Sequence, residues 1–225
     1  MLLPNHLAII IDGNRRWAKK KGLASFNGHK KGMNNVKEIG ERCRKKGIKI
    51  LTLYVFSTEN WKRSKKEINY LMKLFNLVFN KENIEELHQK GIKIKIIGQV
   101  EKLSKALQER IIEAEKLTKN NKKGVLNLAI SYGGRSDIIQ AIKKIVKKKI
   151  SITEEAINNH LWTNDLPDPD LIIRTGGEQR LSNFLIWQSA YSEFYFTKKL
   201  WPDFTINDLD KALKDYSQRQ RRFGK

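Results

Sequence analysis

The sequence predicts an α/β protein with a mostly parallel central sheet of about six strands flanked by helices. Segments with strand character alternate with segments of helical spacing, which is the order that crossovers between parallel strands require. The strand segments are also unbroken apolar runs, which are typical of strands buried on both faces. Because the 225 residues contain no repeat and no linker of biased composition, we expect residues 1–225 to form one domain.

The first part of the chain is expected to contain two strands and two helices. An isoleucine-rich run over 6–11 predicts a buried strand, and Asp12-Gly13-Asn14 predicts a tight turn after it. A short helix over 15–21 ends at a glycine. Helical spacing over 29–46 also ends at a glycine, and the apolar run 48–56 is the second strand.

The middle of the chain continues the alternation. Apolar residues over 67–89 predict one long helix, which a glycine closes. The runs 92–97 and 125–131 predict strands, each followed by glycine within three residues, and 101–118 between them has helical spacing.

The last part of the chain is less regular. A helix is expected over 136–148. The remaining segments are a short helix opening at Thr153, a strand at 171–174, candidate strands or turns at 184–187 and 193–196, and a terminal helix at 206–222.

The composition is strongly basic, with 45 Lys and Arg against 24 Asp and Glu and a net charge of +21. Such a charge suggests nucleic acid or an anionic membrane as a partner. However, 33 of the basic residues are Lys, spread along a chain also rich in Ile and Asn, which is typical of codon bias. No nucleic-acid-binding motif accompanies the charge.

The cysteine count and the hydropathy pattern exclude other classes. A single cysteine, Cys43, excludes an internal disulfide framework and a cysteine-rich zinc site. The longest apolar runs are far shorter than a membrane-spanning helix, and no apolar segment typical of a signal peptide follows Met1. We therefore expect a cytoplasmic protein.

Unusual polar residues gather where the predicted strands end. Ligands of parallel α/β sheets bind beyond the carboxyl ends of the strands. Gly, Arg, Asn, Ser and a few carboxylates at these ends are typical of a diphosphate site with a divalent cation. The four motifs are Asp12-Gly13-Asn14-Arg15-Arg16-Trp17, Ser57-Thr58-Glu59-Asn60-Trp61-Lys62-Arg63, Tyr132-Gly133-Gly134-Arg135 and Arg174-Thr175-Gly176-Gly177-Glu178-Gln179-Arg180.

The first motif has both a functional and a structural interpretation. Gly13 allows an anion to approach the backbone, Arg15 and Arg16 could clamp it, and Asp12 could hold Mg²⁺ against it. Alternatively, Asp12 caps a helix and the arginines form a solvated face. The chain contains neither a Walker motif nor G-x-G-x-x-G after a strand, which disfavours nucleotide binding.

Three further features allow two interpretations each. His29 is either a surface or capping residue, or it contacts a phosphate or carries a proton. Trp17 and Trp61 lie within polar motifs but are also candidate core residues. The helix from Glu67 is apolar over much of its circumference, so it is either buried against the sheet or lines an apolar ligand cavity.

Six motifs in order resemble those of the cis-prenyltransferase family, in particular the bacterial undecaprenyl diphosphate synthases. The resemblance extends from His6 to Gly224. It is carried by HLAIIIDGNRRWA from 6, GHKKG from 28, FSTENWKR from 56, SYGGRSDI from 131, DLIIRTGGEQRLSNF from 170 and RQRRFG from 219.

The resemblance implies an enzyme that condenses isopentenyl diphosphate, in Z configuration, onto an allylic diphosphate, usually farnesyl diphosphate. The product would be a long polyprenyl diphosphate, the lipid carrier of cell-wall peptidoglycan synthesis. The resemblance also implies Mg²⁺, a homodimer, an apolar tunnel between sheet and helices, and transient contact with the inner face of the membrane for product release, without nucleic acid. The alternatives are a basic nucleic-acid-binding protein and a non-catalytic accessory subunit of the family.

The family pattern also assigns roles to residues of this chain. It implies Asp12 and Asn60 as catalytic residues and Asp12 and Glu193 as metal ligands. The implied tail at 219–224 would reach the partner subunit's site. The implied substrate-binding residues are Gly13, Asn14, Arg15, Arg16, Trp17, His29, Ser57, Thr58, Glu59, Trp61, Arg63, Arg174, Arg180 and Ser182. Two positions depart from the pattern: Ser25, where many relatives carry Arg, and Gln179, where some carry His.

Overall fold

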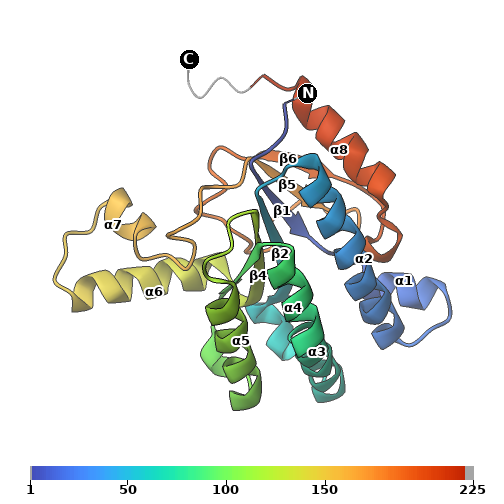
Figure 1. Ribbon diagram of the computed structural model, residues 1–225, viewed down its shortest axis with the longest axis horizontal. Helices are drawn as coiled ribbons and strands as arrows, with labels where there is room; N and C mark the ends of the chain where they lie inside the picture. The colour runs from blue at the N-terminus through green and yellow to red at the C-terminus, as the bar shows by residue number, and fades with distance from the viewer. Residues whose placement is uncertain (1, 221–225) are drawn as a thin grey trace.

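The computed structural model describes residues 2–220 and contains one six-stranded sheet in which every pairing is parallel. The strand order is β3-β4-β2-β1-β5-β6, so β1 lies in the interior of the sheet (Figure 1). The predicted α/β class is confirmed. The strands are β1 His6–Ile10, β2 Ile50–Ser57, β3 Ile92–Ile97, β4 Gly124–Tyr132, β5 Leu171–Arg174 and β6 Glu193–Phe196.

The described residues form eight α-helices, of which α1 to α7 lie between strands and α8 follows β6, and α2 to α5 lie side by side in Figure 1. The short 3₁₀ helix η1, Thr58–Lys62, follows β2. The α-helices are α1 Asn14–Lys20, α2 Ser25–Lys46, α3 Lys65–Val78, α4 Lys81–Gln89, α5 Lys105–Thr118, α6 Gly134–Lys147, α7 Glu154–Asn158 and α8 Ile206–Gln218.

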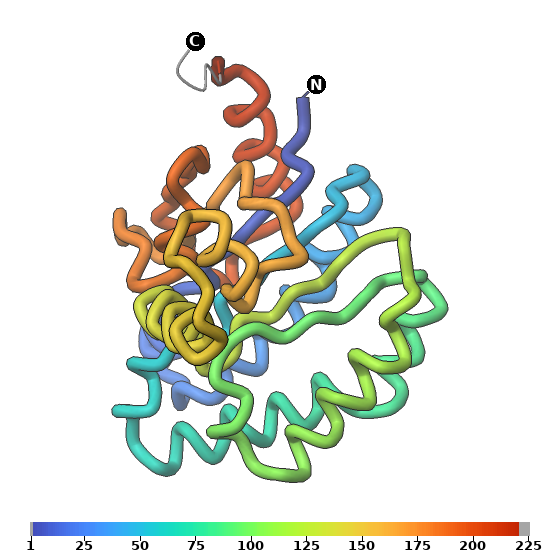
Figure 2. Tube along the Cα trace, turned by 90° about the vertical axis from the view of Figure 1, so that its left-hand side faces the viewer, coloured from blue at the N-terminus to red at the C-terminus, as the bar shows by residue number. Residues whose placement is uncertain are grey.

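The two faces of the sheet are covered differently. Side chains alternate between the faces, so Leu7 and Ile9 pack in one core cluster and Ala8 and Ile10 in another. The first cluster includes residues of α2, α3, α4, α5 and α8. The second is closed largely by an irregular segment around Phe184 and Leu185. Helices therefore cover mainly one face of the sheet, and an irregular segment covers much of the other (Figure 2).

The prediction of one helix over 67–89 is wrong, because the helix breaks at Phe79 and Asn80. The Asn80 side chain accepts a hydrogen bond from the Asn83 backbone N–H at 2.9 Å and caps α4. A capping asparagine competes with continued helix formation, and the apolar residues on both sides hid this break. Residues 184–187 form turns and no strand, whereas the strand at 193–196 is present.

The described chain also bears on membrane insertion. Across residues 2–220, no helix combines the length and the apolar character that crossing a bilayer demands.

Candidate functional site

A cavity of about 1160 Å³ lies beyond the carboxyl ends of β1, β2 and β5. The α1–α2 connection closes one side of it, through residues such as Leu23 and Ala24. The cavity brings together twelve of the predicted site residues. These are Asp12, Gly13, Asn14, Arg15, Arg16, His29, Ser57, Glu59, Asn60, Arg63, Arg174 and Ser182.

Asp12 and Arg174 meet because their strands are neighbours. β1 pairs with β5, with Ile10 opposite Arg174. Asp12, two residues after Ile10, therefore lies at the same end of the sheet as Arg174. Arg174 Nη2 donates to Asp12 Oδ2 at 3.0 Å, and Arg16 Nη2 lies 3.1 Å from Asp12 Oδ1. Arg174 Nη1 donates to Ser182 Oγ at 2.7 Å and to the backbone carbonyl of Arg180.

Arg174 retains an unused donor. Its side chain is only 5% exposed, and no described residue accepts a hydrogen bond from its buried Nε. A buried guanidinium donor without a partner is costly, and an anionic ligand would satisfy it. Arg174 is thus prepared for an additional acceptor beside Asp12.

Two glycines with positive φ lie beside Asp12. Gly13 caps α1 with a φ of 112° and packs against Leu200, and Gly176 has a φ of 93°. A Cβ atom on Gly176 would lie 2.5 Å from Arg16 Nη2 and 3.2 Å from Asp12 Cβ. Any larger residue at 176 would therefore displace the guanidinium that contacts Asp12.

A second group of basic side chains surrounds Glu67 on α3. Arg63 Nη1 donates to Glu67 Oε1 at 2.9 Å, and His29 Nε2 and Arg15 Nε lie 3.4 and 3.7 Å from the same oxygen. The Glu67 side chain is 13% exposed. The sequence predicts the three basic residues as site residues but gives no sign of Glu67, because Glu67 begins a helix of mostly apolar residues.

The environment of His29 keeps its imidazole neutral. Burial is the main cause that lowers the pKa of His29, and the nearby Arg63 lowers it further. Glu67 opposes both effects because its negative charge favours the protonated ring. A neutral imidazole offers one donor and one acceptor nitrogen to a ligand.

The segment after β2 presents Asn60 in a fixed orientation. Asn60 Oδ1 accepts the backbone N–H of Ser57 at 3.1 Å and forms a capping box for η1. Because an amide is not basic at neutral pH, Asn60 can orient a ligand by hydrogen bonding but cannot act as a base that accepts a proton. Glu59 accepts from Asn183 Nδ2 at 2.9 Å and thus ties η1 to the loop after β5.

Four of the predicted substrate-binding residues do not line the cavity. Trp17 donates to Asp203 at 2.7 Å, and Trp61 donates to Ser131 at 2.9 Å and packs against Phe56. Thr58 lies beside Gly133. The Arg180 guanidinium is largely exposed and pairs with Glu178 at 2.7 Å.

Glu193 lies away from the cavity in the described chain. It is the first residue of β6, where it pairs in register with Leu171, and Leu171 in turn pairs with Leu7 near the start of β1. Glu193 Oε2 accepts from Arg219 Nη1 at 2.7 Å. The structure therefore separates Glu193 from Asp12, and most of the predicted tail, residues 221–224, lies outside the described residues.

The cavity also includes residues that sequence reasoning did not assign to the site. Lys19, Tyr54 and Asn183 line it, and so does Ser25, the first residue of α2. Asn183 has a φ of 67° and neighbours Ser182 at 49°. The sequence signal for this left-handed loop is weak, because neither residue is glycine and only Asn183 is of a type enriched in this conformation.

The donor set of the cavity fits a magnesium ion only in part. Within residues 2–220 there is no group of three or more His, Cys, Asp or Glu arranged to hold a metal. Mg²⁺ commonly uses one or two protein carboxylates together with substrate phosphates and waters. Asp12, whose side chain is 30% exposed, fits that role if a diphosphate supplies further oxygens.

Comparison with known proteins gives a consistent result. Residues 10–224 match the sequence profile of a family described as putative undecaprenyl diphosphate synthase. An isoprenyl transferase of Clostridium tetani is 51% identical over 99% of this chain and 89% of its own length. An isoprenyl transferase of Thermotoga maritima is 48% identical over 100% and 98%, respectively.

Solved structures agree with these sequence matches. A lavandulyl diphosphate synthase from Lavandula x intermedia, solved with dimethylallyl diphosphate, superposes with a TM-score of 0.94, 44% identity and 99% coverage of both chains. A probable undecaprenyl diphosphate synthase from Campylobacter jejuni superposes with a TM-score of 0.84, 36% identity and full coverage of both chains. On the strength of its fold, its site and these matches, the chain belongs to the undecaprenyl diphosphate synthase family of isoprenyl transferases.

Proposed function

We propose that this protein elongates an allylic diphosphate, such as farnesyl diphosphate, with isopentenyl diphosphate units in Z configuration. The carrying observation is the pairing of Asp12 with Arg174 at 3.0 Å on the cavity wall, next to a second cation group around Glu67. Each group combines arginines with a carboxylate and retains excess positive charge. Two such groups on one cavity suit two diphosphate ligands.

Each of the two groups of basic residues would bind one of the two substrates. Arg15, His29 and Arg63 would bind the allylic diphosphate, with Gly13 and Asn14 beside it. Arg174 and Ser182 would bind isopentenyl diphosphate, and the free Nε of Arg174 is the donor that such a ligand would satisfy. Arg180 would join them only after its exposed guanidinium leaves Glu178.

These residues would act on the charge that the reaction develops. Breaking the allylic carbon–oxygen bond leaves negative charge on the diphosphate, which the guanidinium groups would stabilise. The allylic carbon then bonds to the isopentenyl double bond, and a proton leaves the resulting cation. Asn60 would orient the isopentenyl unit, and the departing diphosphate is a suitable proton acceptor nearby.

Asp12 is the residue that would hold Mg²⁺ in this scheme. When bound there, Mg²⁺ supplies Lewis-acid stabilisation of the diphosphate leaving group. Asp12 is already oriented by Arg16 and Arg174 from opposite oxygens. A role for Glu193 as a metal ligand would require a second copy of the chain, since its own Asp12 is remote.

The growing chain would extend from the polar groups along apolar residues. Ile10, Ile11, Val55 and Leu71 also line the cavity, and Leu71 belongs to α3. Each five-carbon unit buried there contributes about 3–4 kcal/mol. We propose an apolar tunnel between the sheet and α3 for this purpose and a polyprenyl carrier lipid for cell-wall synthesis as the product.

The similarity to a lavandulyl diphosphate synthase solved with dimethylallyl diphosphate supports a second candidate, a reaction of this short allylic diphosphate without chain elongation. One assay separates the candidates: farnesyl diphosphate, labelled isopentenyl diphosphate and Mg²⁺, followed by chromatography of the lipid product. We expect a ladder of products spaced by five carbons. A single short product that forms equally well from dimethylallyl diphosphate alone would contradict elongation.

The Asp12→Ala variant tests the mechanism. Because Asp12 is partly exposed and lies beyond the end of β1, we expect the variant to fold while turnover falls at least about 1000-fold. Circular dichroism checks the fold, and the same labelled-substrate assay measures turnover. Turnover near that of the wild type would remove Asp12 from the mechanism.

A further inference from the structure

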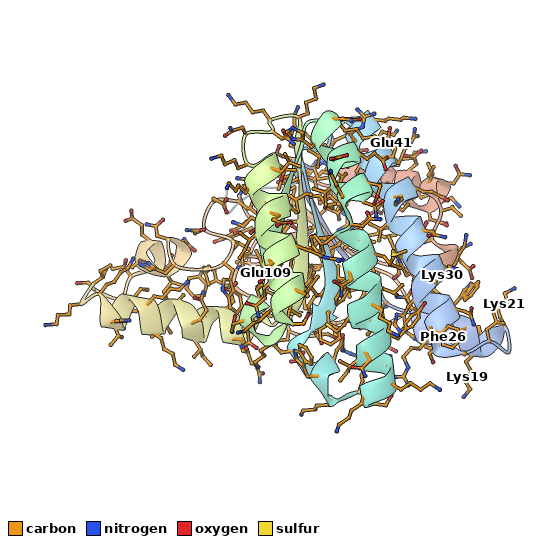
Figure 3. The ribbon with its side chains drawn as sticks, turned by 60° about the horizontal axis from the view of Figure 1, so that its bottom comes forward. Lys19, Lys21, Phe26, Lys30, Glu41 and Glu109 are labelled. Atoms are coloured by element: carbon orange, nitrogen blue, oxygen red, sulfur yellow. The ribbon has the colours of Figure 1, made fainter. Side chains whose placement is uncertain are left out.

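The corner formed by α1 and the start of α2 carries a strong excess of positive charge. Residues 13–37 contain eight basic residues and no Asp or Glu. Lys19, Lys21 and Lys30 lie at this corner in Figure 3, whereas the labelled acids Glu41 and Glu109 lie elsewhere. A surface with this composition attracts an extended anionic partner.

Two large apolar side chains are exposed within the same corner. Leu23, in the α1–α2 connection, is 46% exposed and Phe26, in the first turn of α2, is 45% exposed. The Phe26 ring lies 5.4 Å from the Tyr70 ring of α3, which braces it without covering it. Exposed Leu and Phe surrounded by lysines are typical of segments that enter the headgroup region of a bilayer.

The free cations here are lysines rather than arginines. Arg16 pairs with Asp12 and Arg15 lies 3.7 Å from Glu67, so both guanidinium groups are directed into the site. Lys20, Lys21, Lys30 and Lys31 are exposed. Lysines provide diffuse attraction to anionic headgroups, whereas nucleic-acid recognition favours arginine. A second copy of the chain is disfavoured, because two such corners would repel one another.

The corner also borders the cavity. Lys19, Gly22, Leu23 and Ser25 belong to the cavity wall, so a surface that covered the corner would lie against the cavity mouth. A long apolar product leaving the cavity would otherwise expose its chain to water, which is unfavourable. A bilayer at this position would receive that chain directly.

We propose that Leu23, Phe26 and the lysines of the 19–31 corner form the docking surface for an anionic lipid bilayer. This inference rests on the proposed function for its purpose, but the binding event itself requires no catalysis. The lysines bind the headgroups, and Leu23 and Phe26 enter the interface between headgroups and acyl chains.

Sedimentation with vesicles tests the proposal in the full chain. We expect binding to vesicles of phosphatidylcholine with 30% phosphatidylglycerol, and at least tenfold weaker binding to phosphatidylcholine alone. Lys20→Glu with Lys21→Glu should weaken binding to the anionic vesicles at least tenfold, and Phe26→Ser about threefold to tenfold. Neither variant changes a residue of the cavity wall.

Matched controls separate location from charge. Lys122→Glu with Lys123→Glu alters a second exposed lysine pair, at the amino end of β4, and Leu117→Ser alters an apolar residue that is also 45% exposed. We expect both to bind like the wild type. Equal weakening by the control pair, or competition by a single-stranded RNA oligonucleotide that matches anionic lipid, would overturn the assignment.

A separate readout distinguishes failure of this inference from failure of the proposed function. Condensation of one isopentenyl unit in detergent should proceed at similar rates in the wild type and in all four variants. If this activity is present but vesicle binding is not, the docking surface is wrong and the proposed function stands. If vesicles bind but no condensation occurs, the reverse holds.

Discussion

At the scale of single residues, Gly176 offers the sharpest test of the site, because its neighbour provides a control. Both glycines have positive φ, 93° for Gly176 and 86° for Gly177. A Cβ atom on Gly176 would collide with Arg16, whereas one on Gly177 would find its nearest atom 3.8 Å away, at Lys198 Cα. The two alanine variants thus share a backbone cost but differ in their effect on the site.

We expect Gly176→Ala and Gly177→Ala each to lower the free energy of unfolding by about 1–2 kcal/mol, the cost of a left-handed non-glycine residue. Only Gly176→Ala should also reduce turnover, by about tenfold or more, because Arg16 would be moved from Asp12. Urea denaturation and the elongation assay measure the two effects. Equal loss of turnover in both variants would show that the loop backbone, rather than Arg16, matters.

Glu67 is the second residue whose role is testable. It contacts Arg15, His29 and Arg63 and favours the protonated form of His29. We expect Glu67→Gln to lower the pKa of His29 further and to raise the KM for the allylic diphosphate about tenfold, or ~1.4 kcal/mol, as the cations lose their common partner.

An NMR titration of the His29 ring and steady-state kinetics provide the measurements for Glu67→Gln. Glu41→Gln is the matched control, because Glu41 also pairs with several basic residues, on the exposed surface of α2. An unchanged pKa of His29 in Glu67→Gln would show that Glu67 does not govern the charge of that ring.

At the scale of elements, a buried polar chain joins three strands and a loop. His6 on β1 contacts the carbonyl of Pro167 through Nδ1 at 2.7 Å and the Thr52 hydroxyl on β2 through Nε2 at 2.7 Å. Asn127 on β4 donates to that hydroxyl at 3.0 Å. Because a carbonyl only accepts, Nδ1 carries the proton and neutral Nε2 accepts from Thr52.

This arrangement makes stability depend on pH. Burial is the main cause that lowers the pKa of His6, so below about pH 6.5 the unfolded chain binds a proton that the folded chain resists. The His6 contribution is complete above that pH and is lost as the pH falls toward the folded-state pKa, by up to ~1.4 kcal/mol per pH unit.

Urea denaturation between pH 7 and pH 5 measures this loss. We expect His6→Gln to be less stable at pH 7 but to show a shallower decline toward pH 5 than the wild type. Parallel declines in the two proteins would assign the acid sensitivity to other groups, such as His29.

At the scale of the whole molecule, the distance between Glu193 and Asp12 constrains how the chains could cooperate. Within one chain the two carboxylates lie toward opposite ends of the sheet. If both serve one metal site, two chains must each supply one of them. A mixed dimer of Asp12→Ala and Glu193→Gln chains would then retain one intact site, formed by the Asp12 of one chain and the Glu193 of the other.

We expect each variant alone to lose most of its activity and an equal mixture, refolded together, to recover about a quarter of the wild-type value, as random pairing of chains implies. The elongation assay on the refolded mixture provides the measurement, with each variant refolded alone as the control. Wild-type activity of Glu193→Gln by itself would show that Glu193 is not a metal ligand, and no recovery would exclude sharing between chains.

The sequence by itself determined the sheet and the edge at which the polar residues meet. Continuous apolar runs and glycine-ended helices are local signals, and parallel topology places the residues after β1, β2 and β5 at the same edge. The sequence therefore already assigns Asp12, Arg174 and Asn60 to one site. The division between α3 and α4 was not found, because one capping asparagine outweighed the apolar residues around it.

Only the tertiary structure decided which side chains face one another. Glu67 is part of the site because α3 packs beside the start of α2. Trp17 and Trp61 point away from the cavity because they donate hydrogen bonds to Asp203 and Ser131. Glu193 lies at the start of β6, at the end of the sheet opposite to the site. These outcomes depend on contacts between segments distant in the chain. Local propensity contains no information about such contacts, since they are set by packing and by the satisfaction of buried polar groups.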